Sequence, residues 1–231
     1  MVTKLKIENF DCHCVNFIGS DTILYLIYPA LVEFDDNWLE RMSKDLKIPM
    51  AAVYVPANLW NDVLTPWPEP GEAPGFPPFG GKAKEFLELL TSKIIPSIEN
   101  ELGLSANTTR DLMGVSLSGL FALWQWMESD VFHSIACLSG SFWYEGFRNW
   151  FESLKIPGKT GKAYFLLGKE EPLAHIKAYQ TVGINTEMVV ERLKEAGIPV
   201  EFEWVPGNHF SKPVHRAQRA LQALFTPFPT H

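Results

Sequence analysis

The stretch Arg110–Trp126, RDLMGVSLSGLFALWQW, decides the fold that we predict for this chain. A short apolar run ends at Val115, Ser116 follows, and an apolar helical pattern begins at once. A strand, a serine among small residues and a helix form the arrangement called the nucleophile elbow, G-x-S-x-G. Its turn is so tight that only small residues fit two positions before and after the serine. Gly114 holds the first of these positions and Ser118 the second, so the match is close but needs support from elsewhere in the chain.

The composition of the chain is that of a globular protein. Its 231 residues are 46% hydrophobic and 20% charged, which suits one large core, and we predict a single domain over residues 1–231. The net charge of −7 argues against nucleic acid or an anionic membrane surface as a partner. We see no secretory signal and no apolar run of the ~20 residues that span a bilayer. The three cysteines do not suggest a disulfide framework, so we expect a cytoplasmic protein.

Strand-like and helix-like segments alternate along the chain, as in a parallel sheet covered by helices. We expect strands at residues 4–10, 12–18, 22–28, 50–55, 111–115, 134–138, 162–167 and 200–205, the first two forming an antiparallel hairpin. We expect helices at residues 38–46, 82–102, 117–124, 147–154, 186–196 and 215–225. Pro96 should kink the second helix, because proline removes a hydrogen bond and clashes with the preceding turn. The pattern predicts one α/β domain with a mostly parallel sheet.

Residues 56–81 form a segment that is rich in proline, glycine and aromatic residues. The proline and glycine content predicts a loop rather than a helix or a central strand. A linker is normally polar, and a loop of this length inside a compact domain is usually functional or disordered. We therefore expect a packed loop that borders a pocket. The alternative is a rigid surface crossover whose aromatic side chains fill the core.

Three successive predicted strands deliver a serine, a carboxylate and a histidine at their carboxyl ends. The residues are Ser116, then Glu170 and Glu171 in the sequence GKEEP, and finally His209 in PGNHF. Ligands of open α/β sheets bind outside the carboxyl ends of the strands. The order serine, acid, histidine along the chain is that of α/β-hydrolases rather than of chymotrypsin or subtilisin. Chance explains one of these positions, but not all three in this order.

Each of these residue types has a part in nucleophilic catalysis. A serine hydroxyl becomes a good nucleophile when an imidazole takes its proton, and a carboxylate holds that imidazole in the right tautomer. Two backbone N–H groups must also bind the oxyanion. We expect one from Leu117 and the other from the loop after residues 50–55, where Ala57 or Asn58 can donate and Asn58 is our candidate. This chemistry calls for no metal and no cofactor.

The chain resembles the "putative esterase" family of α/β-hydrolases, which includes siderophore (enterobactin-type) esterases and esterase D-like enzymes. The resemblance runs from about residue 22 to the end, on LWNDVLTPWP, FGGKAKEFLELL, GVSLSGLFALW, CLSGSFWY, LLGKEEP and PGNHF. It implies an α/β-hydrolase fold without a separate lid domain and a metal-independent carboxylic-ester hydrolase. By the same resemblance Ser116 is the nucleophile and His209 the base. The family reads G-x-x-[DE] at the acid, which aligns with Glu171 and leaves Glu170 as the alternative.

Other residues suggest how substrate is bound. Trp60 and Trp143, together with Trp67, could line an aromatic pocket for an acyl or alcohol group, and plain core packing is the alternative for each. The predicted pocket loops hold no basic cluster, which favours a small neutral or aromatic ester over an anionic siderophore. The run Cys12–Cys14 points its members to alternate faces of a strand, so we do not interpret it as a metal site.

Two other functions fit the same sequence. Acyl transfer or thioester cleavage would use the same triad, because water and a competing acceptor attack the same acyl-enzyme. A binding protein with an α/β-hydrolase fold and no catalysis is the other alternative, and the serine at position 118 is the sequence feature that favours it.

Overall fold

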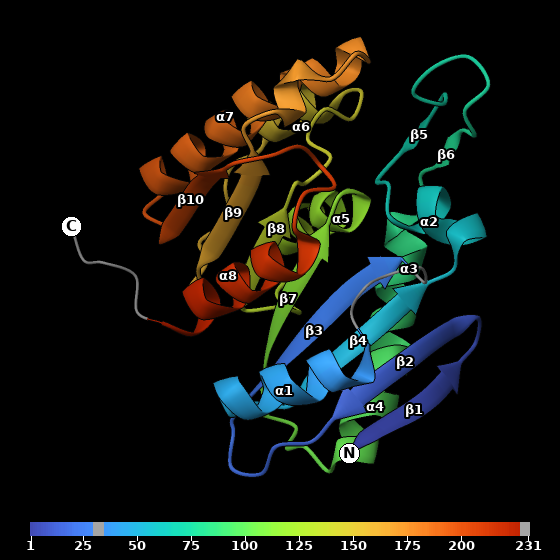
Figure 1. Cartoon of the computed structure of the whole chain (residues 1–231), viewed down its shortest axis with the longest axis vertical. Coiled ribbons are helices and arrows are strands. Elements are labelled where there is room, and N and C mark those ends of the chain that lie inside the picture. The colour runs from blue at the N-terminus through green and yellow to red at the C-terminus, as the bar shows by residue number, and fades with distance from the viewer. Residues whose placement is uncertain (30–34, 227–231) are drawn as a thin grey trace.

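The computed structural model describes residues 1–29 and 35–226, and an eight-stranded sheet lies at its centre (Figure 1). The strand order is β1-β2-β4-β3-β7-β8-β9-β10, in which β1, β2 and β4 pair antiparallel and the remaining pairs are parallel. The bounds are β1 (Val2–Ile7), β2 (Phe10–Val15), β3 (Thr22–Pro29), β4 (Met50–Val55), β7 (Thr109–Val115), β8 (Ser134–Leu138), β9 (Ala163–Gly168) and β10 (Val200–Val205). The predicted α/β class with a mostly parallel sheet is confirmed.

The central strands are buried on both faces, which explains their continuous apolar runs. Along β3, Ile23 and Tyr25 belong to one buried cluster of side chains, whereas Leu24 and Leu26 belong to a second cluster on the opposite face. This alternation follows from the two-residue period of a strand. The sheet therefore separates two hydrophobic cores.

Helices cover both faces of the sheet (Figure 1). The first core lies under α3 (Ala83–Leu89), α4 (Ile95–Leu102), α5 (Leu117–Glu128), α6 (Phe147–Ser153) and α7 (Val182–Glu195). The second lies under α1 (Asp36–Leu46) and α8 (Pro213–Phe225). Helix α5 is buried almost all round, as its apolar sequence indicates. Among the residues described, no helix has the length and apolarity to cross a membrane.

The predicted helix over residues 82–102 differs from the structure in its middle. A π-helical turn, Leu90–Ile94, joins α3 to α4, so the predicted helix is continuous from Ala83 to Leu102 but is not α-helical in its middle. Pro96 lies at the second position of α4 and has no N–H for the preceding turn. A widened turn before the proline is one way to accommodate the missing hydrogen bond and the bulk of the ring.

The segment 56–81 is not a loop throughout. Helix α2 (Ala57–Val63) occupies its start, and the short strands β5 (Pro68–Glu69) and β6 (Phe79–Gly80) form a separate antiparallel pair (Figure 1). The prediction that no helix forms here is wrong for α2. Its seven residues, ANLWNDV, contain neither proline nor glycine. The prediction failed because it used the composition of the whole segment, in which proline and glycine are frequent. The helix expected at residues 186–196 likewise begins earlier, at Val182.

Candidate active site

The turn between β7 and α5 has the backbone of a strained elbow. Ser116 adopts φ 57° and ψ −123°, a conformation that residues other than glycine rarely take. Its N–H donates to the carbonyl oxygen of Leu138 at 3.0 Å, which fixes the turn against β8. A Cβ atom on Gly114 would lie 2.1 Å from the carbonyl oxygen of Ser118. Glycine is therefore required two residues before the serine.

Ser118, the residue that departs from the elbow motif, has a structural role. Its side chain is buried, and its hydroxyl accepts the Val115 N–H at 2.8 Å and lies 2.7 Å from the Ile27 carbonyl oxygen. These bonds direct the hydroxyl into the sheet and connect the elbow to β3. Ser118 therefore replaces the glycine without crowding the turn, and its hydroxyl is already occupied by backbone partners.

Ser118→Ala should destabilise the fold by about 1–3 kcal/mol, because it leaves a buried N–H and a buried carbonyl without their partner. Urea unfolding measures the change. Ser92→Ala is the matched control, since the exposed Ser92 hydroxyl donates to the Glu88 carbonyl oxygen and its loss should change stability little. Equal unfolding midpoints for the two variants would contradict the role that we give to Ser118.

Glu171 and His209 form a pair at the carboxyl ends of β9 and β10. The distance between Glu171 Oε2 and His209 Nδ1 is 2.9 Å. Glu171 is buried, with 7% of its surface exposed, whereas the neighbouring Glu170 is exposed. Of the two candidate acids, the structure brings Glu171 to the histidine.

The second oxygen of Glu171 is held by three donors. Oε1 accepts from Ser139 Oγ at 2.7 Å, from the Gly168 N–H at 2.7 Å and from Arg216 Nη1 at 3.2 Å. Burial by itself would raise the pKa of Glu171, but the hydrogen bonds it accepts, foremost that of His209, lower the pKa below its ordinary value. The carboxylate is therefore charged and fixed in orientation.

Arg216 links the acid to the loop that carries the histidine. It is buried in α8, and while Nη1 contacts Glu171, Nη2 donates to the Asn208 carbonyl oxygen at 2.8 Å. The sequence did not point to Arg216, because nothing in a helical pattern tells which polar residue will face a site. Ser139 was also missed, although its place directly after β8 put it at the same edge of the sheet as the triad.

Ser116 and His209 line the same cavity, but in the described residues their side chains form no hydrogen bond with each other. Ser116 Oγ instead lies 3.4 Å from Ser141 Oγ. Catalytic hydrogen bonds are often long or absent in a free enzyme and form when substrate binds. The His209 side chain is 31% exposed and follows Gly207, which has φ 101°. The histidine therefore lies on a loop at the surface rather than inside the core.

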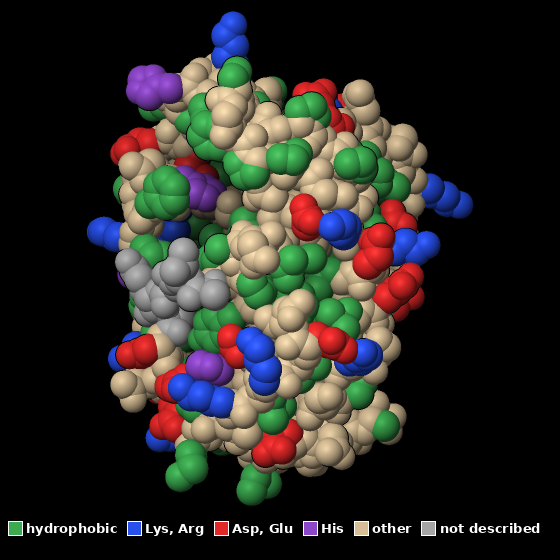
Figure 2. Space-filling view, turned by 90° about the vertical axis from the view of Figure 1, so that its right-hand side faces the viewer, with side chains coloured by type: hydrophobic (Ala, Val, Ile, Leu, Met, Phe, Trp, Pro, Cys, Tyr) green, Lys and Arg blue, Asp and Glu red, His purple; other side chains and the backbone are tan. Residues whose placement is uncertain are grey.

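The cavity beside the elbow has a volume of about 850 Å³, which suits a small molecule. Figure 2 shows a recess on one face, where a histidine lies beside hydrophobic and acidic side chains. Trp60 and Trp143 both line the cavity, whereas Trp67 is not among its lining residues and packs against Tyr144 and Trp150. The segment 56–81 thus contributes to the wall.

The structure separates the two residues expected to stabilise an oxyanion. Leu117 lines the cavity at the first turn of α5, where N–H groups have no partner within the helix. Asn58 is exposed on α2 and does not line the cavity. In α/β-hydrolases the second donor follows the third strand. Here that is β3, the direct neighbour of β7, and residues 30–34 after it lie outside the described ranges.

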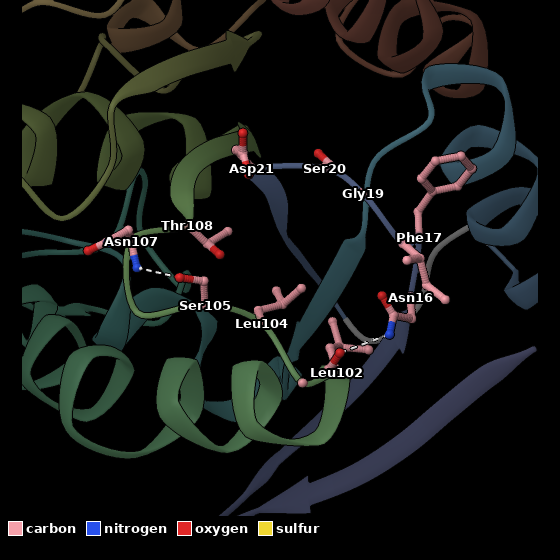
Figure 3. Close-up of a pocket in the computed structure, with 12 residues that line it drawn as sticks. Asn16, Phe17, Gly19, Ser20, Asp21, Leu102, Leu104, Ser105, Asn107 and Thr108 are labelled. Atoms are coloured by element: carbon pink, nitrogen blue, oxygen red, sulfur yellow. Dashed lines mark hydrogen bonds between the residues drawn. The ribbon is translucent and has the colours of Figure 1, made fainter.

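A second cavity, of about 440 Å³, lies at the opposite edge of the sheet (Figure 3). It is lined where β3 and β7 begin and α4 ends, by residues that include Asp21, Thr108 and Leu102. The amino ends of parallel strands are not where ligands of such sheets bind. None of Ser116, Glu171 and His209 lines it, so we place the candidate active site in the larger cavity.

In the Cys12–Cys14 run, the histidine His13 has contacts that explain its position. His13 Nδ1 lies 2.7 Å from Asp36 Oδ1, and its ring packs edge-on against Tyr54. Cys12 and Cys14 are buried, and burial raises the pKa of both thiols. Within the described ranges, no group of three or more potential ligands could hold a metal ion.

Comparison with known proteins identifies the family. A model described as "Putative esterase" matches residues 35–216. The chain belongs to this family. A curated relative, the uncharacterized protein YbbA of Bacillus subtilis, is 28% identical over 138 residues, which are 59% of this chain and 55% of that protein. The match thus spans about half the length of this relative.

Solved structures share the fold at low sequence identity. An IroE-like serine hydrolase from Shewanella oneidensis has a TM-score of 0.76 at 14% identity, covering 97% of this chain and 79% of that one. The siderophore hydrolase EstB from Aspergillus nidulans has a TM-score of 0.72 at 15% identity, covering 100% and 97%. The BES protein from Bacillus cereus has 0.70 at 16%, covering 99% and 95%. At these identities the likeness establishes the α/β-hydrolase fold and not the substrate.

Proposed function

We propose that this esterase-family protein is a serine esterase that forms an acyl-enzyme on Ser116. The observation that carries the proposal is the Glu171–His209 pair, 2.9 Å apart, in the same cavity as a serine on a strained elbow. Ser116, His209 and Glu171 are then nucleophile, general base and orienting acid. Membership of the esterase family supports the class of reaction.

The proposed reaction follows from the roles of these groups. His209 Nε2 takes the proton of Ser116 Oγ as this oxygen attacks the ester carbonyl carbon. Glu171 accepts the Nδ1–H and stabilises the imidazolium, while the Leu117 N–H donates to the developing oxyanion. His209 then protonates the departing alcohol, and water hydrolyses the acyl-enzyme by the reverse proton transfers. Ser116 Oγ and His209 form no hydrogen bond in the free protein, so this bond has to form when the ester binds.

Labelling with a neutral fluorophosphonate tests the nucleophile. We expect one covalent adduct per chain, located at Ser116 by mass spectrometry of the digested protein. Ser116→Ala should not be labelled, whereas Ser118→Ala should still be labelled, because the Ser118 hydroxyl is bound within the sheet. Labelling at another residue, or none at all, would overturn the assignment.

The same triad could also serve acyl transfer or thioester cleavage. Whether hydrolysis or transfer occurs depends on whether water or a second acceptor attacks the acyl-enzyme. Partition of the acyl-enzyme between water and added alcohols or thiols measures this. The binding-protein alternative has one observation in its favour, the missing hydrogen bond between Ser116 and His209. It is distinguished by the labelling experiment, since a protein without a working triad would not react.

A further inference from the structure

We propose that the cavity selects esters that carry a positively charged ammonium group, bound beside Glu72, Trp143 and Tyr179. This inference rests on the proposed esterase function and specifies its substrate class. It differs from the expectation of a neutral or aromatic ester that the sequence provided, because the place of Glu72 in the cavity wall becomes apparent only in the structure.

The charges on the cavity wall have one sign. Glu72, Glu170 and Glu171 line it, and no lysine or arginine is among the described residues that do. Glu171 is already paired with His209 and Arg216. The carboxylates of Glu72 and Glu170 can therefore interact with a ligand in the cavity. A cleft lined by one sign of charge concentrates ligands of the opposite sign.

Glu72 is held in place across two segments that are distant in the sequence. Tyr179 Oη donates to Glu72 Oε2 at 2.5 Å. Burial, reinforced by Glu72, raises the pKa of Tyr179 well above its ordinary value, so the phenol stays a donor. The other oxygen, Oε1, has no hydrogen-bond partner in the described part of the chain. It is therefore available to a ligand.

Aromatic rings lie directly beside this carboxylate. The ring centroids of Trp143 and Tyr179 are 4.5 Å apart, and both side chains line the cavity, as does Trp60. Aromatic faces attract cations through the ring quadrupole, and tryptophan does so most strongly. A carboxylate next to aromatic rings is the chemistry that recognises an ammonium ion. The same wall repels a carboxylate or a catecholate, because such a ligand carries the same negative charge as Glu72 and Glu170.

The test compares esters of equal shape and different charge. In one pair the alcohol is choline or its neutral carbon isostere 3,3-dimethylbutanol, both as benzoates. In a second pair the acyl group carries the trimethylammonium or its tert-butyl isostere, both as phenyl esters. We expect the cationic member of at least one pair to have a kcat/KM higher by about tenfold. Equal values in both pairs would overturn the proposal.

Glu72→Gln should remove most of this difference by lowering kcat/KM for the cationic ester. Glu69→Gln is the matched control, because it makes the same change in net charge from the same segment but does not line the cavity. The control should keep the cationic preference of the wild type. Equal loss of preference in the two variants would attribute the effect to net charge and contradict the role of Glu72.

The outcome separates this proposal from the proposed function. A protein that reacts with the neutral fluorophosphonate but prefers neither charge is an esterase without the cation site. A protein that fails to react is tested by calorimetry with the non-hydrolysable benzyl ethers of choline and 3,3-dimethylbutanol. Tighter binding of the cationic ether supports the site in the absence of catalysis, and equal or no binding of the two ethers refutes it.

Discussion

Ser116→Ala and Ser116→Gly should both reduce kcat for p-nitrophenyl acetate by about 10⁴-fold or more, but they should differ in stability. Either change removes the oxygen that attacks the ester. Only glycine also relieves the backbone, because φ 57° with ψ −123° strains any residue that has a Cβ atom. Such strain costs about 1–3 kcal/mol, and glycine loses about 0.5–1 kcal/mol through its larger unfolded-state entropy.

The free energy of unfolding of the glycine variant should therefore exceed that of the alanine variant by about 1–2 kcal/mol, and the glycine variant should unfold at a higher urea concentration. Urea titration of both proteins gives the difference, and circular dichroism checks that each keeps the native fold. Ser118→Ala is the control for activity, because it alters the same turn without removing the proposed nucleophile. Undiminished hydrolysis by Ser116→Ala would exclude an acyl-enzyme on this residue.

Part of the site could be located from the sequence because of a property of parallel sheets. Their carboxyl ends share one edge, so residues after the strands ending at Val115, Gly168 and Val205 had to lie near one another. The alternation of strands and helices was visible for a similar reason, since buried parallel strands form continuous apolar runs. These inferences depend on local pattern and topology alone.

Other features depend on contacts that local pattern does not determine. The choice between Glu170 and Glu171 follows from the turn after β9, which buries one carboxylate and exposes the other. Arg216 reaches the acid because it lies in the first turn of α8, a helix that packs on one face of the sheet. The Glu72–Tyr179 bond joins residues 107 positions apart. Such long-range pairs form through tertiary packing and have no signature in a single sequence.

Glu171→Gln should reduce kcat by about 10⁴-fold and also destabilise the fold by about 3–5 kcal/mol. The loss of rate follows from the histidine, which would no longer be held in its productive tautomer or stabilised as an imidazolium. The loss of stability follows from Arg216, whose buried guanidinium would keep no charged partner at this position. Stopped-flow or steady-state hydrolysis measures the first effect and urea unfolding the second.

The Glu171 carboxyl group should also affect the stability of the fold at acidic pH. Its pKa is lowered in the folded protein, so its charged form stabilises the fold above the ordinary pKa of a glutamate. That contribution should be lost as the pH falls from the ordinary pKa through the lowered one. Glu171→Gln cannot be protonated there, and its stability should fall less over this pH window than that of the wild type.

A double variant of Glu171 and Arg216 distinguishes the structural role of the Glu171 carboxylate from its catalytic role. Arg216→Met removes the buried charge, so the double variant Glu171→Gln/Arg216→Met should recover most of the lost stability. It should not recover activity, because His209 still lacks its carboxylate. Arg216→Met alone keeps the Glu171–His209 bond and should lose far less rate than Glu171→Gln. If the double variant were as unstable as the sum of the single variants, Glu171 and Arg216 would not be energetically coupled, and Arg216 would not position the acid.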